Sequence, residues 1–532
     1  MNKFKPLLLA AALSLAIGAT HASAADLIPI NFDGADEGYN DPTPAAPVGG
    51  NPGTTIGEQR QMVAQFAAEL WGSVLVSPQP VYIAAQFNPL GANVLGSAGA
   101  TSAWYNFPGV QYPNTLYSVA LAESISDSNL NGNVVDISSQ FSSDYNFYYG
   151  LDGKTPAGQI NFLDVVMHEF GHGLGFQNFE NEAAGTFLAG IQDVYSVYTY
   201  DNTTGKYWTQ MSVAERQASA LNYGQVVFTG ANATAGAQLV LGPRTAFRIT
   251  APGAIAGDYD FGTASFGAPV TASNFSGDVV VGTDAAIPVT SATTTDGCSP
   301  LDNAAAVAGR LVLVDRGSCA FVIKARNVQD AGGIGMIVAD NVAASPAGMS
   351  GTDASVTIPS IRITLALGNA IKSQLPGVQA GVVVDPARLQ GADNAGRPRL
   401  YMPNPVEPGS SGSHYDSAAL PNLLMEPAIN STLLGAFNLD ITPNLLKDTG
   451  WVLNDGTAKI GNCDTGIDLV DDVGLILGAN VQATSNVCLV GAVKRGDYQH
   501  CMDVYKERML AANLITDKQA GKMMACASKL GK

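Results

Sequence analysis

The sequence is poor in histidine, in cysteine and in charge. Its 532 residues include 5 histidines and 6 cysteines, and 14% of the residues are charged. The charge is also one-sided, since 45 acidic residues against 27 basic ones give a formal net charge of −18. An acidic surface repels nucleic acid and anionic membranes. We therefore expect neither nucleic acid nor a membrane surface among the partners of this protein.

Long hydrophobic runs are absent beyond the first residues, where residues 7–17 form one short apolar segment. This segment follows two lysines, Lys3 and Lys5, and precedes an Ala-Ser-Ala sequence at residues 22–24, as in a signal peptide. A membrane anchor would need about 20 apolar residues. We therefore expect residues 1–24 to be a signal peptide. The mature chain would be exported to the periplasm or the extracellular space and have no membrane span.

The cysteines all lie in the second half of the chain. No two of them have the C-x-x-C spacing of a zinc site, and an even number in an exported chain indicates disulfides. Pairing in sequence order would join residues 298–319, 463–488 and 501–526, although other pairings are open. The six candidates are Cys298, Cys319, Cys463, Cys488, Cys501 and Cys526.

The most informative run reads His-Glu-Phe-Gly-His, from His168 to His172. Positions i and i+4 share one face of a helix, so both histidines can hold one metal ion. Glu169 lies beside that face and can reach a metal-bound water as a general base. The apolar neighbours predict a helix over about residues 159–174 that is buried against a core. This pattern is typical of a zinc hydrolase.

A catalytic zinc ion usually has three protein ligands and an open position for water, so a third ligand is needed. Gly175 completes an H-E-x-x-H-x-x-G pattern, which is typical of the metzincin peptidases. In their short pattern the third histidine follows the glycine by three residues, but Asn178, a poor zinc ligand, stands there. Glu180 and Glu182 are alternatives, although both lie close to the end of the helix.

His414 is the stronger candidate for the third ligand. It lies in the run Ser-Gly-Ser-His-Tyr-Asp at residues 411–416. Met425 follows at a distance that suits a methionine turn beneath the metal. Of the remaining histidines, His21 belongs to the expected signal peptide and His500 is expected at the surface.

These features together resemble the leishmanolysin-type metzincins, in which HExxHxxGF precedes a long insertion, a Ser-His-aromatic-acid run, a Met-Pro turn and a DxGW ending. Here Phe176 completes the first pattern, and Leu-Leu-Lys-Asp-Thr-Gly-Trp at residues 445–451 supplies the ending. The resemblance covers about residues 140–180 and 408–452. It implies one catalytic zinc ion held by the three histidines, with Glu169 as general base and Met425 in the turn below.

Between these parts the chain changes to strands and glycine-rich turns. Residues 309–319 predict a buried strand that enters a turn, residues 321–331 an amphipathic helix, and residues 334–339 a second buried strand. Together with Ile-Pro-Ser-Ile at residues 358–361, this stretch resembles the protease-associated (PA) domain family. The resemblance implies a domain without catalytic residues that influences substrate access, and in which the first two cysteines form a disulfide.

The expected fold is a mixed α/β (α+β) zincin-like catalytic domain, interrupted by a PA insertion and followed by a small helical, disulfide-stapled tail. In the tail we expect helices over residues 497–506 and 518–529, joined by Cys501 and Cys526. Further expected elements are a strand at 28–33, a helix at 56–71 and a strand at 81–87. The expected parts are the signal peptide (1–24), the first catalytic part (25–246), the PA insert (247–384), the second catalytic part (385–455) and the cysteine-containing tail (456–532).

The sequence therefore favours a secreted zinc-dependent metalloendopeptidase, which cleaves proteins or peptides with a zinc-activated water. The alternative is a non-catalytic exported binding or adhesion protein that retains the zincin shell, although a binding module needs no general base such as Glu169. An exopeptidase is less favoured, because the two-metal ligand runs of PA-containing aminopeptidases are missing. No cysteine precedes Cys298, so latency through a prosegment cysteine is not expected.

Overall fold

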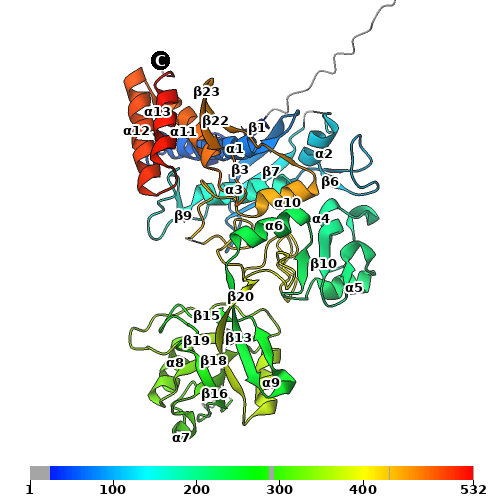
Figure 1. Cartoon of the computed structure of the whole chain (residues 1–532), viewed down its shortest axis with the longest axis vertical. Coiled ribbons are helices and arrows are strands. Elements are labelled where there is room, and N and C mark those ends of the chain that lie inside the picture. Colours follow the sequence, from blue (N-terminus) through cyan, green and yellow to red (C-terminus); the bar gives the residue numbers. More distant parts are fainter. Residues whose placement is uncertain (1–23, 133, 287–292, 431, 531–532) are drawn as a thin grey trace, which may run out of the picture.

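The computed structural model describes residues 24–132, 134–286, 293–430 and 432–530. It is a mixed α/β structure with two lobes (Figure 1). The lobe from β13 to β20, residues 243–389, is called the insert, and the residues before and after it form the body. Strands β13 (Pro243–Ala251) and β20 (Gln379–Leu389) run side by side from the junction of the lobes into the sheet of the insert. The expected signal peptide, except for its last residue, lies outside the described residues. Among the helices that are described, none is long and apolar enough to cross a membrane.

A four-stranded sheet forms the centre of the body, in the order β1-β3-β7-β4. The strands β1 (Leu27–Asn31), β3 (Val81–Asn88) and β7 (Ile137–Ser142) are parallel, and β4 (Gly96–Ala100) is antiparallel to β7 at the edge. The two strands expected near residues 28–33 and 81–87 are thus confirmed. The body also contains short strands, paired in separate two-stranded sheets, and one short helix. They are β2 (Leu75–Val76), β5 (Ala103–Trp104), β6 (Tyr117–Ser118), α2 (Val119–Ser126), β8 (Phe147–Tyr148), β9 (Ile160–Asn161) and β21 (Val452–Leu453).

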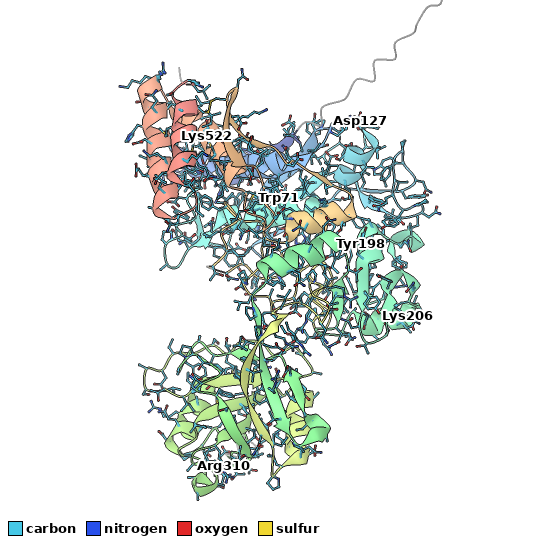
Figure 2. The ribbon with its side chains drawn as sticks, in the orientation of Figure 1. Trp71, Asp127, Tyr198, Lys206, Arg310 and Lys522 are labelled. Atoms are coloured by element: carbon cyan, nitrogen blue, oxygen red, sulfur yellow. A yellow bond between two sulfur atoms is a disulfide. The ribbon has the colours of Figure 1, made fainter. Side chains whose placement is uncertain are left out.

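Helix α1 (Ile56–Val74) begins at a capping box, in which the side chain of Thr55 accepts from the backbone of Glu58. This confirms the helix expected over residues 56–71. Its last turns are apolar and contact α3 (Phe162–Gly173), the helix of the His-Glu-Phe-Gly-His run. Trp71, near the centre of the body in Figure 2, is fully buried and donates its indole N–H to the carbonyl of Met167 at 3.1 Å.

Helix α3 is buried along its whole length, which confirms the expected buried helix. The side chain of Asn161 caps it by accepting from Leu163 N at 3.0 Å. At the other end, Trp451 donates its indole N–H to the carbonyl of Leu174 at 2.7 Å. The helix therefore holds its polar motif in a largely dry setting, where electrostatic interactions are strong.

A smaller region connects α3 to the insert. Its three-stranded sheet has the order β11-β10-β12. Asp448, on α10 (Thr442–Thr449), accepts from the backbone of Asn232 and Ala233 at the start of α6, and so ties the ending of the motif to this region. The elements here are α4 (Val194–Tyr198), β10 (Thr199–Asp201), β11 (Lys206–Tyr207), α5 (Val213–Ser219), β12 (Val226–Phe228) and α6 (Ala231–Val240).

The insert is built on an eight-stranded sheet in the order β14-β13-β20-β16-β17-β18-β19-β15. Its central strands β16 to β19 are parallel, and separate apolar clusters pack beside the sheet. The strands and helix expected between residues 309 and 339 are confirmed, as is the disulfide Cys298–Cys319. The other elements are β14 (Gly257–Tyr259), β15 (Gly262–Thr263), β16 (Ser276–Val281), α7 (Ala304–Val307), β17 (Leu311–Asp315), α8 (Phe321–Asp330), β18 (Gly335–Ala339), β19 (Ser360–Ile363) and α9 (Leu365–Gln374).

The C-terminal tail contains the hairpin β22 (Thr457–Ile460) and β23 (Cys463–Asp468), followed by α11 (Leu477–Gly491), α12 (Arg495–Ala511) and α13 (Asp517–Ala527). Helices α12 and α13 confirm the two helices expected over residues 497–506 and 518–529. Helix α11 packs on α1, so the tail shares the apolar core of the body.

Two of the three disulfides differ from the pairing in sequence order. The bonds are Cys463–Cys526 and Cys488–Cys501, and the expected bond between Cys501 and Cys526 is wrong. The reason is α11, which the sequence analysis did not predict. This helix places Cys488 beside α12, while α13 packs on strand β23 and brings Cys526 to Cys463.

Candidate metal centre

The side chains of His168, His172 and His414 meet at one point in the body. Their Nε2 atoms are 3.0 Å apart for 168 and 172, 3.2 Å for 172 and 414, and 3.3 Å for 168 and 414. All three residues are 5–7% exposed. They are the only group of three potential metal-ligating residues within the ranges that the structure describes. The structure thus brings together the three histidines that the sequence singled out.

Each of these rings has its other nitrogen, Nδ1, bound to a backbone carbonyl. The acceptors are Leu424 for His168 at 2.7 Å, Phe176 for His172 at 2.8 Å and Ser410 for His414 at 2.8 Å. A carbonyl oxygen can only accept, so each Nδ1 carries the proton. In the neutral rings all three Nε2 atoms are then acceptors that face one another, with no proton between them. Three acceptor nitrogens that face one another require a cation between them.

The spacing of the Nε2 atoms fits a zinc ion. With Zn–N bonds of about 2.05 Å, tetrahedral geometry places the ligand nitrogens about 3.3 Å apart. Burial also lowers the pKa of His168 to about 4 and that of His414 to about 3. Burial, followed by the charges of the other two histidines, lowers the pKa of His172 well below its usual range. The rings therefore stay neutral at physiological pH, as metal ligands must be.

The turn after α3 explains the role of Gly175. Its φ of +117° is unfavourable for other residues. The turn is closed by Gly175 N donating to the carbonyl of His172 at 3.0 Å and by Phe176 N donating to that of Gly171 at 3.1 Å. It carries the carbonyl of Phe176 back to the ring of His172. Gly175 therefore helps to orient the ring of His172.

Met425 is fully buried in the core of the body. A Cβ on Gly171, one residue before His172, would lie only 2.8 Å from its sulfur, so the methionine packs tightly against α3 at that point. The preceding residue, Leu424, supplies the carbonyl that holds His168. Met425, which the sequence places in a methionine turn, is thus in contact with the helix that carries His168 and His172.

Glu169 points towards strand β4 at the edge of the sheet. A Cβ on Gly96 would lie 2.7 Å from its Oε1, and Ala98 contributes a backbone hydrogen bond to its carboxyl group. Glu169 is 5% exposed, and this burial raises its pKa to about 8, against which the bond from Ala98 acts. A cation held by the histidines would favour the ionised form.

The metal centre opens into a cleft of about 600 Å³. It is lined by β4 and the preceding residues on one side and by residues 408–410 and 426–429 on others. Its carboxylates belong to Glu169, Glu180, Glu182 and Glu426, and no lysine or arginine is among the described residues that line it.

The alternative third ligands lie in the cleft but not at the metal centre. Glu180 accepts from the hydroxyl of Ser196 and shares a hydrogen bond with Asp193. Burial, followed by the charge of Asp193, raises its pKa well above the usual range. Glu182 bonds to the side chain of Asn178. Neither glutamate belongs to the group of residues that can share one ion.

Asp440 is a residue that sequence reasoning missed. Its carboxyl group accepts from Leu424 N at 2.5 Å and from Ile441 N at 2.6 Å, and it is 4% exposed. It therefore anchors the residue whose carbonyl holds His168. The one signal for Asp440 in the sequence is its position shortly before α10 begins. Tyr415, next to His414, is fully buried, packs its ring on Phe176 and does not line the cleft.

Comparison with known proteins identifies one part of the chain. Residues 275–371 match the PA domain family, within the insert. The chain is 34% identical over 147 residues to Vacuolar-sorting receptor 2 of Arabidopsis thaliana, covering 24% of this chain and 22% of that protein. It is 51% identical over 53 residues to human ER degradation-enhancing alpha-mannosidase-like protein 3, covering 10% and 6%. The Probable lipoprotein aminopeptidase LpqL of Mycobacterium tuberculosis is 36% identical over 80 residues, covering 15% and 16%. The chain thus spans less than a quarter of each relative.

Solved structures match short parts of the chain as well. A zinc aminopeptidase from Bacillus subtilis aligns over 29% of this chain and 36% of its own, with a TM-score of 0.19 and 19% identity. A subtilisin-like protease from an Antarctic Pseudoalteromonas aligns over 27% and 34%, with a TM-score of 0.19 and 18% identity. Similarity at this level has no bearing on the body that holds the three histidines.

Proposed function

We propose that this protein is an exported zinc metalloendopeptidase of the metzincin type, with a PA domain inserted between its second and third metal ligands. The observation that carries the proposal is the meeting of three buried Nε2 acceptors, each ring oriented by a backbone carbonyl. Glu169 beside them supplies a group that a purely structural metal site does not need. The three disulfides are typical of a protein that folds in an oxidising compartment, which supports export.

In the proposed reaction His168, His172 and His414 would hold one zinc ion. Bound zinc would supply Lewis-acid chemistry, by polarising the scissile carbonyl and lowering the pKa of water. Glu169 accepts the proton of the water that attacks the carbonyl, and then donates it to the leaving amine. Its contacts with β4 hold the carboxyl group at the wall of the cleft. The buried walls limit competing water and strengthen these charge interactions.

The edge strand supports cleavage within a chain. Residues 93–98 line the cleft, and β4 is the last strand of its sheet. An extended peptide can add to such an edge by backbone hydrogen bonds. A substrate in this position would extend past Glu169 in both directions, as an endopeptidase requires.

An aminopeptidase is the second candidate, favoured by one observation. The cleft is lined by the carboxyl groups of Glu169, Glu180, Glu182 and Glu426, and no lysine or arginine is among its described lining residues. Carboxylates in this position suit the ammonium group of a peptide N-terminus. The relative named as an aminopeptidase matches only 15% of the chain and does not decide between the two.

The test is hydrolysis of labelled casein by residues 25–532, with and without a zinc chelator, beside the Glu169→Ala variant. We expect chelator-sensitive cleavage by the wild type. The variant should keep one zinc ion per chain, and its rate of cleavage should be about 10²–10⁴-fold lower than that of the wild type. Equal activity of the variant would exclude the mechanism. A folded, zinc-loaded wild type that cleaves nothing would favour the binding-protein alternative.

Peptides with a blocked N-terminus separate the two peptidase classes. An endopeptidase cleaves an internally quenched, N-acetylated peptide as fast as the free one. An aminopeptidase needs the free amine, so acetylation would abolish its cleavage.

A further inference from the structure

The segment that carries His414 is paired with the chain that returns from the insert. Tyr401 N donates to the carbonyl of His414 at 2.9 Å, and Gly412 N donates to that of Tyr401 at 2.8 Å. Asp416 N donates to the carbonyl of Arg399 at 3.0 Å. Strand β20, which leaves the insert, ends at Leu389, shortly before this pairing. The third ligand is thus held by the first residues of the body after the insert.

Arg399 connects this pairing to the insert. Its guanidinium Nη1 donates to Oδ2 of Asp260 at 2.6 Å. Asp260 follows β14 of the insert, and its other oxygen, Oδ1, accepts from Arg244 on β13 at 3.0 Å. One carboxylate of the insert therefore bridges an arginine of the body and an arginine of the connecting strand.

These charges are largely removed from solvent. The side chains of Arg399 and Arg244 are 8% and 10% exposed, and that of Asp260 is 15% exposed. Burial acts against the ionised form of Asp260, but the two arginines outweigh it and lower its pKa. Loss of one member of such a buried group leaves charges uncompensated, which is costly.

We infer that Asp260 of the insert, acting through Arg399, is a positioning residue for the third metal ligand His414. The inference rests on the proposed metal centre. It assigns the insert a task in addition to any effect on substrate access. When the ion pair between Asp260 and Arg399 docks the insert on the body, the backbone of residues 399–401 is in position to pair with the segment that carries His414.

The test measures zinc affinity in the full chain, by competition with a chromophoric chelator, and the absorption spectrum of the Co²⁺-loaded protein. The variant is Asp260→Asn. We expect its zinc affinity to fall about 10- to 100-fold, as for other residues that act through a ligand. The Co²⁺ spectrum should change as well, because the geometry at one ligand relaxes. Asp260→Glu, which keeps the charge, should recover part of the affinity.

Asp258→Asn is the matched control. Asp258 lies two residues away and forms a two-bond ion pair with Arg248, at 2.6 and 2.8 Å, within the insert. This variant should change zinc affinity less than twofold. If Asp260→Asn binds zinc as the wild type does, or if Asp258→Asn loses as much affinity, the inference is wrong.

A second variant covers the case in which Asp260→Asn does not fold. Arg399→Met removes the charge from the body side and leaves the pair of Asp260 with Arg244 in place. It should show the same loss of zinc affinity, and wild-type affinity would overturn the inference. A wild type that binds no zinc would instead exclude the proposed function.

Discussion

Gly96 and Glu169 are packed so closely that no side chain fits between them. A Cβ on Gly96 would lie 2.7 Å from Oε1 of Glu169 and 2.9 Å from its Cδ. Gly96 is on the edge strand β4, and Glu169 is on the buried helix α3. The position of the proposed general base therefore depends on the absence of a side chain on a neighbouring strand.

The first prediction concerns this contact. Gly96→Ala should displace the carboxyl group of Glu169 while leaving the three histidines in place. We expect zinc content to stay at the wild-type level and casein cleavage to fall about 10- to 100-fold, since misplaced groups lose this much rate. Gly99→Ala is the control, because a Cβ there would meet only the end of the Gln177 side chain, with Oε1 at 3.0 Å. Full activity of Gly96→Ala would contradict the close packing.

The second prediction concerns the third ligand. His414→Gln should reduce zinc retention after dialysis to well below one ion per chain, measured by atomic absorption, because two imidazoles remain. His500→Gln, a change at an exposed histidine, should retain zinc fully. Glu182→Gln should retain it too, since Glu182 is outside the group that can share one ion. Loss of zinc from Glu182→Gln with retention by His414→Gln would reverse the assignment.

The third prediction concerns stability and pH. Burial raises the pKa of Asp164 to about 7, against which the hydrogen bond from Gly435 N at 2.7 Å acts. In the unfolded chain its pKa is about 3.9. The folded protein therefore favours the protonated form, and its stabilising contribution is complete below about pH 4 and is lost as the pH rises to about 7.

Asp164→Asn removes this titration and keeps an oxygen for Gly435. Between pH 4 and 7 the free energy of unfolding of the wild type should fall relative to the variant by up to about 4 kcal/mol. Urea denaturation of both proteins at each pH, with chelator present, measures the difference. A difference that is constant over this range would show that Asp164 does not titrate there.

The fourth prediction concerns the disulfides of the tail. Mass spectrometry of a non-reduced digest should find peptides that link Cys463 to Cys526 and Cys488 to Cys501. Replacing the first pair by serine should cost about 4 kcal/mol of stability and the second about 3 kcal/mol, because the first closes the longer loop. Linked peptides that contain Cys463 with Cys488 would contradict the structure.

Local patterns in the sequence determined much of this protein. The helix that carries His168 and His172, the strands and helix between residues 309 and 339, and the two last helices are all confirmed. Each follows from periodicity within a few turns or a few strand residues, where neighbours in sequence are neighbours in space. The position of His414 in a distinctive run was enough to name it, and the structure places it beside the other two histidines.

The tertiary structure alone decided what holds these residues in place. No sequence pattern around the motif points to the groups that hold its side chains. These groups are the carbonyls of Leu424 and Ser410, the carboxylate of Asp440 and the gap at Gly96. The pairing of Cys463 with Cys526 likewise depends on how α13 packs on β23. His172 and His414 are 242 residues apart, and their Nε2 atoms lie 3.2 Å apart. A contact of this kind depends on the packing of the whole body around the insert, because spacing along the chain carries no information on distance between separately folded segments.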